Sequence, residues 1–63
     1  MDSTDRLIEI LLLQHFMEKE DNLKRYVYAL PESMRDTDKV EDLKTVQMLK
    51  KAQIERLKDL KIL

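Results

Sequence analysis

His15 and Glu18 come nearest, by residue type and spacing, to a chemical site. They are three positions apart, so on a helix both side chains could reach one metal ion, in the reverse order of the Glu-x-x-His pairs of di-metal bundles. One chain would supply only this pair of ligands, and the sequence has no cysteine to add a thiolate. A solvated polar pair is the simpler interpretation, so we expect no metal and no other cofactor.

Other groups with catalytic potential lack partners. The carboxylates of Glu20, Asp21, Glu41 and Asp42 lie in charged runs, with lysines nearby and no aromatic pocket around them. Neither serine has a recognisable base that could activate it, and the absence of glycine excludes a phosphate-binding loop. We therefore expect a protein that is not an enzyme.

The carboxyl-terminal third is rich in basic residues. Candidate nucleic-acid contacts there are Lys50, Lys51, Arg56 and Lys58, which in a dimer would form a doubled basic stripe along phosphates. The whole chain nevertheless has a formal net charge of -1, and no tryptophan is present to stack on bases. The same residues fit the solvated face of an amphipathic helix. Nucleic-acid binding is therefore the alternative hypothesis.

The most informative segment runs from residue 7 to residue 17. Eight of its eleven residues are apolar, and at 100° per residue they point in every direction around a helix. Eleven helical residues extend only about 16 Å, which is too short to cross a bilayer, so we expect no transmembrane segment. A helix that is apolar on all sides must be covered on all sides, and a chain of 63 residues offers too little surface to do so.

The first of two expected helices covers about residues 4–29. Ser3 or Thr4 is its expected N-cap. Acidic residues near its start are expected to stabilise it, because they lie at the positive end of the helix dipole. If the helix has a break, the Asp21-Asn22 pair is the point where it would fall. The helix is expected to end before Pro31, because the residue before a proline is pushed out of helical geometry.

A turn is expected over about residues 30–37 and a second helix over about 38–62. Ser33 or Asp38 is the expected cap of the second helix. Two helices of similar length joined by a short turn favour antiparallel pairing. The expected fold class is therefore all-α, a two-helix antiparallel hairpin that forms one unit over residues 1–63.

The leading hypothesis is a non-enzymatic protein-interaction or regulatory module. Its apolar first helix would pack against a copy of the chain, giving a homodimeric four-helix bundle, or would dock on a larger protein. In length and layout alone the chain resembles the small helical-hairpin proteins that pair in this way, such as the plasmid RNA-regulating protein ROP, although no residue motif is shared. The expected partner-binding residues are Leu7, Ile8, Leu11, Leu12, Phe16, Met17 and Tyr28.

The expected role and location follow from the same features. Small proteins of this kind commonly act as regulators or inhibitors that cover a partner's surface. The amino-terminal segment has acidic residues before its apolar run and no small-residue cleavage site after it, so it does not resemble a secretory signal. We therefore expect a cytoplasmic protein.

Overall fold

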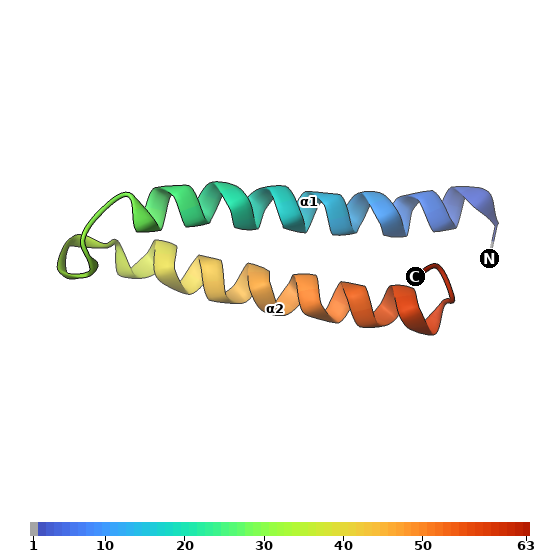
Figure 1. The fold of residues 1–63 in the computed structure, drawn as a ribbon. Helices are drawn as coiled ribbons and strands as arrows, with labels where there is room; N and C mark the ends of the chain where they lie inside the picture. The colour runs from blue at the N-terminus through green and yellow to red at the C-terminus, as the bar shows by residue number, and fades with distance from the viewer. Residues whose placement is uncertain (1) are drawn as a thin grey trace.

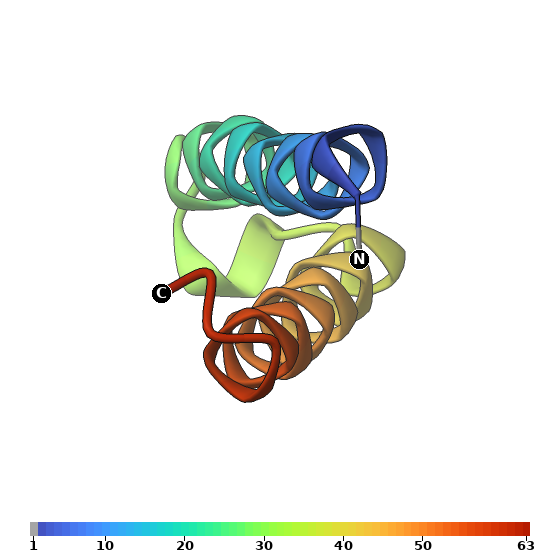
Figure 2. The same ribbon diagram turned by 90° about the vertical axis from the view of Figure 1, so that its right-hand side faces the viewer.

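The computed structural model describes residues 2–63, which form an all-α, two-helix antiparallel hairpin (Figure 1). Helix α1 spans Ser3–Tyr28, a short 3-10 helix η1 spans Glu32–Met34, and helix α2 spans Thr37–Asp59. Met1, the first residue of the expected unit, lies outside the described residues. The helices lie side by side in a rod of 47 × 16 × 15 Å, with both chain ends opposite the turn (Figures 1 and 2). The expected fold class is confirmed.

Both helices begin at an aspartate cap. Asp2 Oδ1 accepts a 2.9 Å hydrogen bond from the backbone N–H of Asp5, and Asp36 Oδ1 accepts one of 2.9 Å from the backbone N–H of Asp38. These bonds satisfy donors that the first turn of a helix leaves unpaired. The caps expected from the sequence are therefore wrong: an aspartate that precedes each expected start already supplies a capping oxygen.

Helix α1 is continuous through the Asp21-Asn22 pair. Asp21 Oδ2 lies 3.0 Å from Arg25 Nη2 one turn later, an ion pair that supports the helix at the point where a break would fall. The helix ends at Tyr28, and Pro31 precedes η1. This continuity lets one face of α1 run along the whole length of α2.

Helix α2 ends at Asp59, earlier than the expected end near residue 62. Lys61 adopts the left-handed conformation, with φ of 60°. Its backbone N–H donates to the Lys58 carbonyl at 3.0 Å, and the backbone N–H of Ile62 donates to the Leu57 carbonyl at 2.8 Å. This pair of bonds is the Schellman motif, which closes a helix and usually has glycine at the left-handed position. A lysine fills that position here.

The apolar core is small. Val27, Leu43 and Val46 form its buried cluster, in the part of the rod nearer the turn. Phe16, Leu23 and Val40 pack against this cluster. Within residues 2–63, neither helix has the combination of length and apolar character that crossing a bilayer requires.

Candidate interaction surface

The face that α1 turns toward α2 follows steps of four and three residues. Such steps keep side chains in one narrow stripe along a helix. The α1 residues that are buried or half-buried are Glu9, Leu13, Phe16, Glu20, Leu23 and Val27. Because this stripe is narrow and includes two glutamates, most of the apolar ring at the start of α1 is left facing solvent.

Glu9 joins the open end of the hairpin to α2. The side-chain amide of Gln53 donates to the Glu9 carboxylate at 2.7 Å and to the Glu9 carbonyl oxygen at 3.0 Å. Arg56 Nε lies 3.0 Å from both carboxylate oxygens. The hydrogen bond from Gln53 lowers the pKa of Glu9 below its ordinary value of 4.5; desolvation opposes this shift and the Arg56 guanidinium adds to it.

Glu20 makes the second polar link between the helices. Lys50 Nζ donates to Glu20 Oε1 at 2.7 Å, and the two side chains are 29% and 10% exposed. The hydrogen bond from Lys50 lowers the pKa of Glu20 below 4.5, against the effect of desolvation and with help from the positive charges of Lys50 and Lys24. Within residues 2–63, every buried side-chain nitrogen or oxygen has a hydrogen-bond partner. We call Glu9, Glu20, Lys50 and Gln53 the polar seam.

Most of the residues expected to bind a partner are exposed on α1. The exposed fractions of Leu7, Ile8, Leu11, Leu12 and Met17 lie between 39% and 56%. They surround the amino-terminal half of α1 on the sides that α2 does not cover. These five side chains therefore form a band around the exposed sides of α1, which we call the apolar surface.

Phe16 and Tyr28, the other two expected partner-binding residues, lie elsewhere. Phe16 is half-buried and packs against the core cluster, so its role in the hairpin is internal packing. Tyr28 is exposed at the turn end of α1, and the Arg35 guanidinium lies 5.0 Å from the centre of its ring. Arg35 Nε also donates to the Leu30 carbonyl at 3.1 Å. Tyr28 is thus an exposed residue beside Arg35, at the opposite end of α1 from the apolar surface.

The four expected nucleic-acid contacts divide into two pairs. Lys50 and Arg56 are held by glutamates of α1, as described above. Lys51 and Lys58 are exposed, and Lys58 Nζ lies 3.7 Å from Glu55 Oε1 on the same helix. The basic stripe expected on α2 is therefore partly used to hold the hairpin together.

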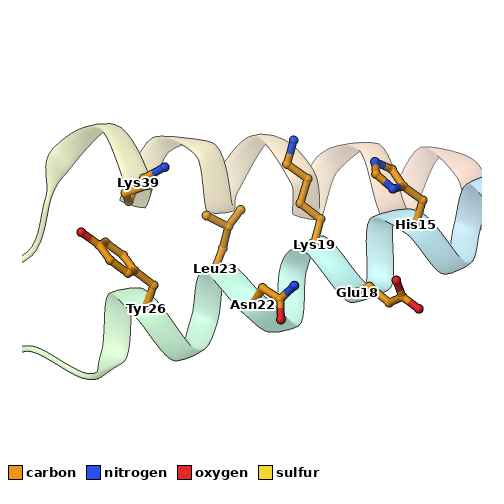
Figure 3. A pocket seen from close by; sticks show the side chains of 7 residues that line it. All are labelled: His15, Glu18, Lys19, Asn22, Leu23, Tyr26 and Lys39. Atoms are coloured by element: carbon orange, nitrogen blue, oxygen red, sulfur yellow. The ribbon is translucent and has the colours of Figure 1, made fainter.

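An open hollow of about 490 Å³ lies along one side of the hairpin, and it contains His15 and Glu18. Figure 3 shows the imidazole and the carboxylate directed away from each other, and the Tyr26 ring directed toward Lys39. No group of three or more potential metal-ligating side chains occurs within residues 2–63. The other residues that line the hollow are Lys19, Asn22, Leu23, Tyr26 and Lys39, and none of them is a nucleophile with a base directed at it.

Comparisons with protein-family models, with curated proteins and with solved structures give no match for this chain.

The polar seam is the part of the site that was not expected from the sequence. In the sequence, Glu9 is one of three polar residues in the otherwise apolar segment from residue 7 to residue 17, and Glu20 belongs to a charged run. The signal that could have revealed them is the 4-3 spacing of Glu9, Leu13, Phe16, Glu20, Leu23 and Val27. A glutamate at an inward position is not expected from the sequence alone, because the hydrogen-bond donor on the other helix that would satisfy it is not known.

Proposed function

We propose that this protein is a non-enzymatic interaction module that acts by burying the apolar surface of α1 against another polypeptide. One observation supports the proposal above all others. Five large apolar side chains gather at one end of a small hairpin, each at least 39% exposed. Isolated exposed apolar residues are ordinary, whereas a contiguous group marks a binding surface.

The energetic case rests on burial. Full burial of a leucine, isoleucine or methionine side chain contributes about 1.5–3 kcal/mol, so side chains that are half exposed still contribute about 1 kcal/mol each on binding. The hairpin gains little from these residues by itself, because its own core holds only a few buried apolar side chains. Covering the surface therefore stabilises both the complex and the fold. In the cell such a module would regulate or inhibit its partner by covering part of the partner's surface.

Leu12 offers the direct test. Leu12→Asp places a charge on the apolar surface at a position that is 39% exposed and outside the core cluster, so the helices should form as in the wild type. We expect this variant to lose association, measured as molar mass by light scattering and as capture of proteins from an extract of the source cells. Phe16→Asp is unsuitable, because it would place a charge against the core.

The matched control is Met48→Asp, at an exposed position of α2 that lies outside the apolar surface and is 73% exposed. We expect it to associate and to capture proteins as the wild type does. Circular dichroism should show the same helix content for both variants. Wild-type association by a folded Leu12→Asp variant would refute the proposal.

A further inference from the structure

One side of the hairpin carries exposed apolar side chains from both helices. Lys19 lines one hollow together with Tyr26 and a second hollow together with Leu49, so these residues of α1 and α2 lie on the same side. Steps of four and seven residues bring further side chains into line with them along each helix. We call this the lateral face, and its residues are Ile8, Leu12, Lys19 and Tyr26 of α1 and Asp42, Leu49 and Arg56 of α2.

The solvent-accessible area of the hairpin is larger than that of a compact monomer of the same mass, and the difference indicates how much surface a partner could cover. The hairpin exposes 5049 Å². A compact monomer of 7.6 kDa would expose about 4300 Å² by the usual relation between surface and mass. The excess, roughly 750 Å², is close to the about 800 Å² that each partner contributes to a standard stable interface. One partner of similar size, covering one side of the rod, would remove the excess.

The charges on α2 are arranged symmetrically about Leu49. Asp42 lies seven residues before it and Arg56 seven residues after it, each about 10.5 Å away along the helix. A two-fold axis at Leu49 therefore brings Asp42 of each copy beside Arg56 of the other. Arg56 is able to accept this second partner: only its Nε contacts Glu9 among residues 2–63, and its side chain is 58% exposed.

The same rotation matches the apolar parts of α1. An axis at the level of Leu49 is also at the level of Lys19 of α1, because the two residues line the second hollow together. Leu12 lies seven residues before Lys19 and Tyr26 seven residues after it, so Leu12 of one copy lies over Tyr26 of the other, where the two side chains, 39% and 53% exposed, cover each other. We propose that the occupant of the lateral face is a second copy of the chain, packed antiparallel about a two-fold axis at Leu49. This inference rests on the proposed function.

The absence of cysteine from the sequence makes the axis testable by cross-linking. In the proposed dimer a Leu49→Cys side chain meets its own copy at the axis, so mild oxidation should link most of the protein as a covalent dimer. The control is Met48→Cys, which is 100° away around α2 and 73% exposed. It should remain largely unlinked under the same conditions. Light scattering of the wild type, from micromolar to millimolar concentration, should show twice the mass of the chain.

Three results would overturn the inference, and each differs from failure of the proposed function. A monomer at every concentration excludes the second copy; the proposed function then still stands if Leu12→Asp abolishes capture of another protein. A dimer in which Met48→Cys links as well as Leu49→Cys excludes the lateral face. A dimer in which neither cysteine variant becomes cross-linked excludes a two-fold axis at Leu49, and with it the proposed packing.

Discussion

Glu20 of α1 accepts a 2.7 Å hydrogen bond from Lys50 of α2, across the contact between the two helices. The pair lies between Phe16 and Leu23, at an inward position that leucine would fill in an ordinary two-helix contact. Neither charge is fully removed from water, so the geometry allows a strong hydrogen bond with moderate desolvation. The pair therefore joins the helices at their midpoint while adding little apolar burial.

Loss of one member of this pair should cost more than loss of both. Lys50→Met leaves the Glu20 carboxylate, 10% exposed, without its ion-pair partner. We expect the free energy of unfolding to fall by about 1–3 kcal/mol. The double variant Glu20→Leu with Lys50→Met should recover that loss or exceed the wild type, because apolar replacement of a paired charge is often stabilising. Urea unfolding followed by circular dichroism measures both, and additive effects would contradict the expected coupling.

Acid should weaken the hairpin through Glu9 and Glu20. Hydrogen bonds from Gln53 and from Lys50 lower the pKa of the two carboxyls in the folded chain. A lowered folded pKa gives stability that is present above the unfolded value of 4.5 and is lost as pH falls through the folded values. We expect the melting temperature to be nearly constant from neutral pH to about pH 5 and then to fall.

Matched glutamine variants isolate this effect. Glu9→Gln with Glu20→Gln should melt lower than the wild type at neutral pH and change less on acidification. Glu18→Gln, at an exposed position of α1, serves as the control and should keep the wild-type slope below pH 5. Equal slopes in all three proteins would show that the polar seam does not carry the pH dependence.

The end of α2 should gain stability from glycine. Lys61 has φ of 60°, a conformation that costs a residue with a Cβ roughly 1 kcal/mol and costs glycine almost nothing. We expect Lys61→Gly to raise the free energy of unfolding by about 0.5–1 kcal/mol. Lys51→Gly, in the helical part of α2, should lower it by a similar amount, roughly 0.5–1 kcal/mol. Thermal melts of the two variants give opposite signs if the Schellman motif closes the helix as described.

Of the four expected nucleic-acid contacts, Lys51 and Lys58 are the two that no glutamate of α1 holds. Two phosphate contacts per chain give a slope of only about -2 in a plot of log binding constant against log salt concentration. Fluorescence anisotropy with a labelled duplex measures this slope. Binding with this slope that is lost in the Lys51→Ala Lys58→Ala variant would favour the alternative hypothesis over protein interaction, and absence of binding would exclude it.

The hairpin itself could be predicted from residues that obey simple rules. Leu23 and Val27 lie one turn apart on one face, Pro31 excludes helix, and the second half has no breaker, so two paired helices follow. The apolar surface could be predicted as well, because a ring of leucines cannot be covered by one neighbouring helix. The expected fold class is confirmed for these reasons, and five of the residues expected to bind a partner are exposed.

The polar seam and the burial of Phe16 depend on contacts between residues far apart in the chain. Glu9 rather than Leu12 faces α2 because Gln53, more than forty residues away, supplies an amide donor that the Glu9 carboxylate accepts and a leucine side chain could not. Phe16 was assigned to the surface because its neighbours are apolar, yet its position between Glu9 and Leu23 in the inward stripe places it in the core. The left-handed Lys61 follows from hydrogen bonds of the closing turn, which a lysine does not signal.

Both termini lie at the same end of the rod, opposite the turn (Figure 1). Suppose that two copies are fused in one polypeptide. In an antiparallel dimer the C-terminus of the first copy and the N-terminus of the second would be separated by nearly the full 47 Å. A linker across that span needs at least about 14 fully extended residues. Copies with their turns together would need only a short tether. Genetic fusion with tethers of graded length would thus select one topology over the other without altering any side chain of the hairpin.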